Sequence, residues 1–214
     1  MNKTLIIGAS GQIGTKLGRL LSKKKIRATA MVRNKSNASN LSLPGIDIVE
    51  ADLENNFSAA YTACDKVVFS AGSGSQTSSD KTLLIDLWGA CRAIDIAKEN
   101  NINHFVMISS RGADNPDNGP ETIKPYLVAK HFADNYLINS GLNYTILRPG
   151  RLIDEDGTGL INTARPINAN DQVISREDTA HAVYHCLSSD ITIGRIYELY
   201  KGQTPIESAL LSSN

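Results

Sequence analysis

Three glycines at three-residue steps stand near the N-terminus, in the segment Gly8-Ala9-Ser10-Gly11-Gln12-Ile13-Gly14. The apolar run 4–7 before them predicts a buried strand, and apolar residues at helical spacing predict a helix over 12–24. Glycine permits a tight turn and a close approach of the backbone to phosphate, while the helix directs free N–H groups at the anion. The pattern alone is weak evidence, but its place between a strand and a helix predicts a dinucleotide site.

The residue after the second expected strand, 27–32, bears on the type of dinucleotide. An acidic residue at this point would hold the ribose 2′-hydroxyl of NAD, whereas this chain has Arg33 followed by Asn34. A guanidinium pairs with a 2′-phosphate through charge-assisted hydrogen bonds. The sequence therefore predicts NADP(H) as the cofactor, in preference to NAD(H).

Tyr126 and Lys130 are four residues apart on a helix expected over 125–139, so their side chains leave the same face. A phenol with a pKa of about 10 needs help to transfer a proton at neutral pH, and a nearby ammonium lowers that pKa by favouring the phenolate. The pair is thus a candidate for acid–base chemistry. Tyr197 and Lys201 share the spacing, but they lie in a strand-like stretch and are interpreted as structural.

These residues require a scaffold in which strands and helices alternate. Strands are expected at 4–7, 27–32, 46–50, 66–70, 104–109 and 144–147, the last ending before Arg148-Pro149-Gly150, and helices at 12–24, 57–61, 82–99 and 125–139. The tail is expected to add strands at 172–174 and 196–199, a helix at 176–187 and a final helix capped by Thr204-Pro205. This alternation predicts an α/β fold with a doubly wound parallel sheet and ligands beyond the carboxyl ends of the strands. We expect one domain over 1–214, in which 151–214 supplies a small substrate-capping region.

Composition narrows the classes of partner. The chain has 214 residues with 22 basic and 22 acidic side chains, and it lacks the basic surplus of a duplex nucleic-acid binder. It has no apolar run near the ~20 residues that span a bilayer, and the first strand begins at once, so we expect a cytoplasmic protein without a membrane or nucleic-acid partner. Cys64, Cys91 and Cys186 are interpreted as free buried thiols, and no metal site is predicted.

Three further side chains allow local predictions. Trp88, the single tryptophan, is expected to be packed, and Asp178 is expected to help form the start of a helix after Ser175. Asp86 lies inside the expected helix 82–99, and the sequence leaves open whether it packs in the core, lies at an interface or belongs to the site.

Taken together, the motifs resemble those of the atypical short-chain dehydrogenase/reductase group, in particular its NAD(P)H-binding, NmrA-like single-domain proteins. The resemblance extends from end to end: GASGQIG at 8–14, VRN at 32–34, ADL at 51–53, SAG at 70–72, ISSRGA at 108–113, YLVAK at 126–130, SGLNYTILRPG at 140–150 and SREDTA at 175–180. These motifs are specific to the superfamily but not to one substrate.

The resemblance implies roles for individual residues. Tyr126 is the proton donor or acceptor, Lys130 its electrostatic partner and a contact to the nicotinamide ribose, and Ser109 or Ser110 holds the substrate oxygen. The interval from Ser109 to Tyr126 is longer than in the short, well-studied reductases, which leaves the choice of serine open. The implied cofactor contacts are Gly8, Ser10, Gly11, Gln12, Ile13, Gly14, Arg33, Asn34, Asp52, Leu53, Ser70, Ala71, Gly72, Ile108, Ser109, Lys130, Pro149, Gly150, Arg151 and Leu152.

Three functions remain open at this stage. The leading hypothesis is an NADPH-dependent oxidoreductase acting on a small carbonyl or quinone-like substrate. The alternatives are a non-catalytic NADP(H)-binding redox sensor, as the NmrA-like resemblance implies, and a nucleotide-sugar epimerase or dehydratase, for which the short C-terminal region leaves little chain. The substrate is not determined, and both a monomer and a homodimer are compatible with the sequence.

Overall fold

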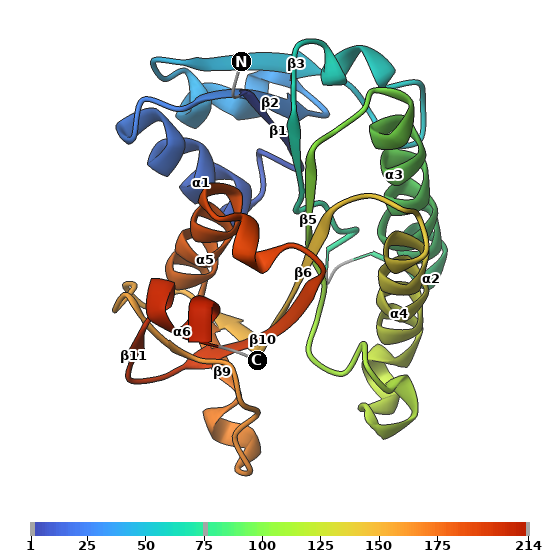
Figure 1. Ribbon diagram of the computed structural model, residues 1–214. Coiled ribbons are helices and arrows are strands. Elements are labelled where there is room, and N and C mark those ends of the chain that lie inside the picture. Colours follow the sequence, from blue (N-terminus) through green and yellow to red (C-terminus); the bar gives the residue numbers. More distant parts are fainter. Residues whose placement is uncertain (1–2, 75–76, 213–214) are drawn as a thin grey trace.

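The computed structural model describes residues 3–74 and 77–212 and shows a nine-stranded sheet between two layers of helices (Figure 1). The strand order is β11-β8-β10-β6-β5-β4-β1-β2-β3. The strands are β1 (Lys3–Ile7), β2 (Arg27–Val32), β3 (Ile46–Glu50), β4 (Lys66–Phe69), β5 (His104–Ile108), β6 (Tyr144–Pro149), β8 (Leu160–Asn162), β10 (Arg195–Lys201) and β11 (Thr204–Pro205). A separate parallel pair consists of β7 (Arg151–Ile153) and β9 (Val173–Ser175).

Helices connect the strands and cover both faces of the sheet. They are α1 (Gln12–Lys23), α2 (Ser79–Lys81), α3 (Ala90–Glu99), α4 (Lys124–Ile138), α5 (Arg176–Ser188) and α6 (Ile206–Ser212), with a π-helical segment, η3 (Thr82–Gly89), between α2 and α3. In Figure 1, α1, α5 and α6 lie on one side of the sheet, and α3 and α4 lie on the other. Each side has its own hydrophobic cluster, centred on residues such as Leu17 and Val183 on one side and Phe105 and Ile94 on the other.

The predicted doubly wound parallel sheet is confirmed. β1 pairs in parallel with β2 on one side and with β4 on the other, so the winding of the chain reverses between β1 and β4. Ligands of such sheets bind at this reversal, beyond the carboxyl ends of the strands. The loops after β1, β2 and β4 meet at this reversal, which is where the motifs predict the cofactor site.

The sequence prediction was wrong about the end of one strand and the start of the last helix. β6 does not end before Arg148 but continues through Pro149, where it pairs with Leu199 of β10. Proline is tolerated because it lies in the last position of the strand and needs no donor there. Thr204-Pro205 does not begin the last helix but forms β11, which pairs with β8.

The C-terminal region, which the sequence predicts to be a small substrate cap, forms part of the central sheet and of one helix layer. Its strand β10 extends the central sheet beside β6, and α5 packs against α1 in the helix layer. At the start of α5, the Ser175 hydroxyl accepts a hydrogen bond from the Asp178 N–H and donates one to Asp178 Oδ2, each at 2.9 Å. The predicted role of Asp178 at this helix start is thereby confirmed.

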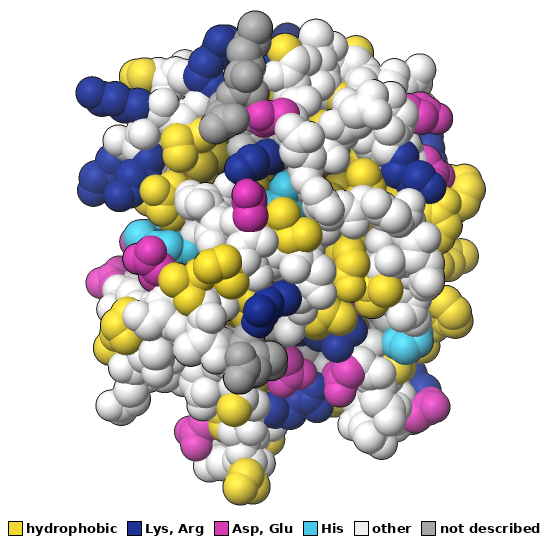
Figure 2. Space-filling view, viewed as in Figure 1, with side chains coloured by type: hydrophobic (Ala, Val, Ile, Leu, Met, Phe, Trp, Pro, Cys, Tyr) yellow, Lys and Arg dark blue, Asp and Glu magenta, His cyan; other side chains and the backbone are white. Residues whose placement is uncertain are grey.

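The prediction that Trp88 is packed was wrong. Its side chain is 58% exposed on η3, and Leu83 and Phe132 are also exposed on η3 and α4. Figure 2 shows hydrophobic side chains along the corresponding right-hand edge of the molecule. Cys91 and Cys186 are buried and Cys64 is half-buried, all as free thiols. Across 3–74 and 77–212, no helix combines the length and the apolar character needed to cross a membrane.

Candidate cofactor and catalytic site

The turn between β1 and α1 has the backbone geometry of an anion cradle. Gly8 has φ +85°, and a Cβ at this position would lie 2.6 Å from the backbone nitrogen of Ala71. A Cβ on Gly14 would lie 2.4 Å from the carbonyl oxygen of Gly8, so both glycines are required by close backbone contact. The first turn of α1 has no acidic residue and no side-chain cap, which leaves its N–H groups available to a phosphate.

A cavity of about 380 Å³ adjoins this turn and extends over the ends of β2 and β3. Among the residues predicted from the sequence, its wall contains Gly8, Ser10, Gly11, Arg33, Asp52, Leu53, Ser70, Ala71 and Gly72. The structure adds Glu54 and Lys81, which form an ion pair of 2.7 Å across the wall. Lys81 lies 27 residues from Glu54, and no local pattern in the sequence indicated this pairing.

Arg33 lines the first cavity with an exposed side chain, and no acidic side chain occupies the end of β2. Asn34, by contrast, uses its Oδ1 to accept the Ser36 N–H at 2.8 Å and caps a short 3₁₀ helix. Neither Asn34 nor Gln12 lines this cavity or the second cavity beside it.

A second cavity, of about 580 Å³, continues from the first. The two share Ser70, Ala71, Gly72, Ser73 and Thr77, from the loop after β4. Predicted residues in the second wall are Ile13, Ser70, Ala71, Gly72, Ile108, Ser109, Tyr126, Lys130 and Leu152. The glycine turn and the Tyr126–Lys130 pair therefore line two cavities that adjoin along the loop after β4.

Tyr126 lies in the first turn of α4, directly after Pro125, and is half-buried in the second cavity. Burial raises the pKa of its phenol well above the usual range, and the nearby carboxylates of Asp86 and Asp134 raise it further, while a hydrogen bond with Ser110 opposes them. The expectation that Lys130 lowers this pKa was wrong, because desolvation dominates. The phenol is thus protonated at neutral pH, but the raised pKa makes it a weaker acid, so efficient proton donation requires a ligand or a positive charge that lowers the pKa again.

Lys130 is only 1% exposed, and its Nζ donates to the carbonyl oxygen of Ile108 at 2.8 Å. The same Nζ lies 5.9 Å from the centre of the Phe69 ring. An ammonium has three donors. Because Lys130 also lines the second cavity, its remaining donors are close to any ligand bound there.

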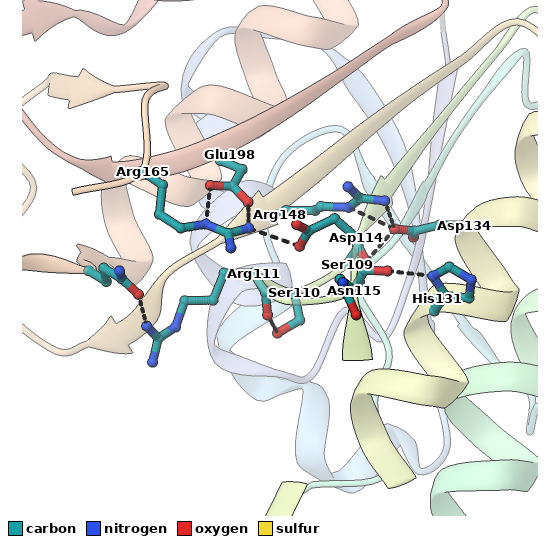
Figure 3. Close-up of polar contacts among 12 residues, drawn as sticks. Ser109, Ser110, Arg111, Asp114, Asn115, His131, Asp134, Arg148, Arg165 and Glu198 are labelled. Atoms are coloured by element: carbon teal, nitrogen blue, oxygen red, sulfur yellow. Dashed lines mark hydrogen bonds and ion pairs between the residues drawn. The ribbon is translucent and has the colours of Figure 1, made fainter. Parts of the chain in front are cut away.

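The two candidate serines have different partners. Ser109 is buried and donates its hydroxyl to Asp134 Oδ2 at 2.9 Å, whereas Ser110 donates to the Arg111 carbonyl oxygen at 3.1 Å and lies close enough to the Tyr126 phenol to lower its pKa. Figure 3 shows Ser109 and Arg148 converging on Asp134. Ser109 lines the second cavity, while Ser110 is not part of its wall but contacts the phenol that is.

Asp134 is a site residue that sequence reasoning missed. It is fully buried, and both Nε and Nη2 of Arg148 lie 3.0 Å from its Oδ2. Burial raises the pKa of this carboxyl, and the Arg148 guanidinium opposes the shift. The sequence does contain a pattern that could have indicated Asp134, because Tyr126, Lys130 and Asp134 follow one another at four-residue steps on one face of α4.

The segment 149–152 contributes less to the cavity than the resemblance implied, since only Leu152 lines it. The Gly150 N–H donates to Leu199 at 2.9 Å and the Arg151 N–H to Gln172 at 2.8 Å, so this segment is held by β10 and by the residue preceding β9. The Arg151 side chain is exposed. These residues position Leu152 through backbone pairing.

A second polar network joins the loop after β5 to the C-terminal region. Arg165 pairs with Glu198 and, at 2.8 Å, with Asp114, and Arg111 contacts Gln172 (Figure 3). These contacts tie the loop after β5, which continues into the Pro/Gly/Asn-rich segment 114–121, to the segment around β9.

The glycine turn identifies the class of protein once it is compared with known families. A family model described as NAD(P)H-binding matches residues 8–190, from the first glycine of the turn through α5. The chain belongs to this NAD(P)H-binding family. The resemblance drawn from the motifs is thereby confirmed at the level of the family.

Individual members of the family are similar over nearly the whole chain. The Bacillus subtilis protein YhfK, named as an uncharacterized sugar epimerase, is 43% identical over 97% of this chain and 98% of its own. A solved structure from Bacillus halodurans, named provisionally as a NAD-dependent epimerase/dehydratase, has a TM-score of 0.93 at 41% identity, covering 98% of this chain and 99% of its own. The Lactococcus lactis oxidoreductase YlbE has a TM-score of 0.86 at 28% identity, covering 98% and 95%.

Proposed function

We propose that this NAD(P)H-binding protein is an NADPH-dependent oxidoreductase that reduces a small carbonyl or quinone-like substrate. The observation that carries the proposal is that the two cavities adjoin along the loop after β4. The glycine turn lines the first cavity, and Tyr126 and Lys130 line the second. A cofactor whose phosphates bind at the turn therefore extends toward a proton donor.

The chain's own residues supply the proton and the orientation. NADPH, when bound, supplies the hydride that adds to the carbonyl carbon of the substrate. Tyr126, protonated at neutral pH, donates its phenolic proton to the carbonyl oxygen, which completes the reduction to a hydroxyl group. Ser110, close to the phenol, helps to lower its pKa, and Lys130 offers its free donors to the ribose hydroxyls of the cofactor.

Arg33 supports the choice of NADPH over NADH. It lines the first cavity at the end of β2, where an acceptor for the 2′-hydroxyl of NAD would be an acidic side chain. A 2′-phosphate would pair with its guanidinium, whereas NADH offers no charged group there.

A nucleotide-sugar epimerase is the second candidate, favoured by the names of the similar Bacillus proteins. Such an enzyme would use the same Tyr126 and the same cofactor but would return the hydride to its substrate. It would therefore keep its cofactor through the reaction and show no net consumption of NADPH. A redox sensor would bind the cofactor but would catalyse neither the reduction nor the epimerisation.

One experiment separates these functions. The protein is titrated with NADPH and NADH by calorimetry, and NADPH consumption is then followed at 340 nm with a panel of small aldehydes and quinones. We expect tighter binding of NADPH and consumption that falls at least about a hundredfold in Tyr126→Phe, a typical contribution of acid catalysis. Consumption unchanged by Tyr126→Phe contradicts the catalytic assignment, and binding without consumption favours the sensor or the epimerase.

A further inference from the structure

Asp86 stands apart from the other buried acids of the molecule. It is 1% exposed in η3 and lines the second cavity. Its Oδ2 accepts the Ser73 N–H at 3.0 Å, but its Oδ1 has no hydrogen-bond partner in the described part of the chain. The buried Asp178, in contrast, accepts the N–H groups of Thr158 and Gly159 at 3.1 and 2.8 Å.

The two basic residues of the same cavity have other partners: Lys130 donates to Ile108, and Arg176 pairs with Asp154 at 2.9 Å. Within 3–74 and 77–212, no ion pair includes Asp86. Asp134 also has one oxygen without a partner, but its other oxygen carries Arg148 and Ser109. A buried acceptor without a donor is unfavourable, so its retention calls for a function.

The local backbone presents Asp86 to the loop that the two cavities share. η3 is a π-helical segment, and such segments recur at functional sites because they redirect side chains. A Cβ on Gly72 would lie 3.1 Å from Asp86 Oδ1, so the glycine leaves room beside this oxygen. The sequence around it, TLLIDLWG, is otherwise apolar, and packing alone would be served by an apolar side chain.

Polar side chains elsewhere in the cavity wall have partners other than this oxygen. The hydroxyls of Ser73 and Thr82 are hydrogen-bonded to each other at 3.2 Å, and Lys130 donates to the carbonyl oxygen of Ile108. Tyr126 and Asp86 therefore face the same space with opposite capacities, one as a donor and one as an acceptor.

We infer that Asp86 accepts a hydrogen bond from an N–H or O–H group of the substrate and so selects carbonyl compounds that carry such a donor near the reacting carbonyl. The inference rests on the proposed function, because the carbonyl is assigned to Tyr126. It narrows the substrate class: ketones and aldehydes without a donor satisfy Tyr126 but leave Asp86 unpaired. Sites of this kind discriminate strongly against analogues that lack the donor.

A matched pair of ligands tests this inference by binding. The protein is loaded with NADP+, so that no reduction takes place, and is titrated with pyrrole-2-carboxaldehyde and with its N-methyl derivative, which differ in the N–H donor. Because a hydrogen bond to a charged group contributes about 1.5–3 kcal/mol, the N–H aldehyde is expected to bind wild type at least about tenfold more tightly.

Asp86→Asn keeps an acceptor for the Ser73 N–H but can present a donor at the free position, so the preference is expected to disappear. Asp95→Asn is the matched control, since Asp95 lies on α3 outside both cavities and accepts only the Tyr136 hydroxyl. Equal binding of the two aldehydes by wild type, no binding of the N–H aldehyde at millimolar concentration, or an unchanged preference in Asp86→Asn overturns the inference. The wild-type comparison needs no variant and is decisive even if Asp86→Asn fails to fold.

Before the aldehydes are added, titration of the protein with NADP+ tests the proposed function separately. Failure to bind NADP+ contradicts the cofactor assignment. Binding of NADP+ with no discrimination between the aldehydes contradicts only the role of Asp86.

Discussion

Ser109 and Asp134 form a buried hydrogen bond, with 2.9 Å between Oγ and Oδ2, on the side of α4 that carries Tyr126 and Lys130. Because Ser109 gives its proton to this carboxylate, its hydroxyl is not free to donate to a substrate oxygen. Ser110, which lies close enough to the Tyr126 phenol to lower its pKa, is the serine that we propose acts with Tyr126. The Ser109–Asp134 bond instead joins the end of β5 to α4.

The two serines are therefore expected to respond differently to removal of the hydroxyl. Ser110→Ala should lower kcat/KM for NADPH-dependent reduction by about tenfold, because one hydrogen bond to the proton donor is lost. Ser109→Ala should lower the free energy of unfolding by about 1–2 kcal/mol, because it deprives buried Asp134 of a donor, with a smaller effect on turnover. Steady-state kinetics and urea unfolding of both variants test this, and a larger kinetic effect for Ser109→Ala would reverse the assignment.

Arg33 is expected to decide between the two dinucleotides. Arg33→Ala should weaken NADPH binding by about tenfold, through loss of an exposed charge-assisted pair, and leave NADH binding unchanged. Arg27→Ala provides the control, since Arg27 lies at the opposite end of β2, beside Asp47. Calorimetric titration measures both, and an equal loss of affinity for NADPH and NADH would show that Arg33 does not contact a 2′-phosphate.

Arg148 is expected to stabilise the fold through Asp134. Arg148→Met leaves a fully buried carboxylate without its cation, and the free energy of unfolding should fall by about 3 kcal/mol. The double variant Arg148→Met/Asp134→Asn has no uncompensated charge, so its free energy of unfolding should be higher than that of Arg148→Met alone. Urea denaturation of both variants measures the difference, and strictly additive effects of the two substitutions would disprove the coupling.

His104 should make the fold sensitive to acid. Burial lowers its pKa to about 4, helped by the charge of Lys66, whereas the unfolded chain has the ordinary value of 6.5. Between these values the unfolded state binds more protons, so stability present above pH 6.5 is lost as pH falls toward 4, by about 3 kcal/mol.

The comparison of wild type with His104→Gln isolates this contribution from that of the carboxylates. Glutamine retains a group that can bond to Thr145 Oγ1, which His104 contacts at 2.8 Å through Nε2. The free energy of unfolding, measured in urea at pH 7 and at pH 4.5, should fall more in wild type than in the variant. An equal fall in both proteins would mean that His104 is already protonated in the folded protein.

Much of the fold followed from local patterns. The strands β1 to β5 and the helices α1 and α4 lie within two residues of their predicted bounds, because short apolar runs ending in glycine or polar residues and helical periodicity are local signals. The family and the glycine turn were also evident, since Gly8 and Gly14 are required by contacts within the turn and with the neighbouring β4 loop. The short strands β7, β8 and β11 were missed because two or three residues carry no periodicity.

The sequence by itself determined the family, the glycine turn after β1 and the common helix face of Tyr126 and Lys130. Only the tertiary structure decided that Ser109 bonds to Asp134, that Arg148 compensates Asp134, and that Asp86 lines the same cavity as Tyr126. The reason is physical: helix faces and turns depend on neighbours a few residues away. The environment of a buried charge depends instead on side chains that β5, β6, η3 and α4 bring together from distant parts of the chain.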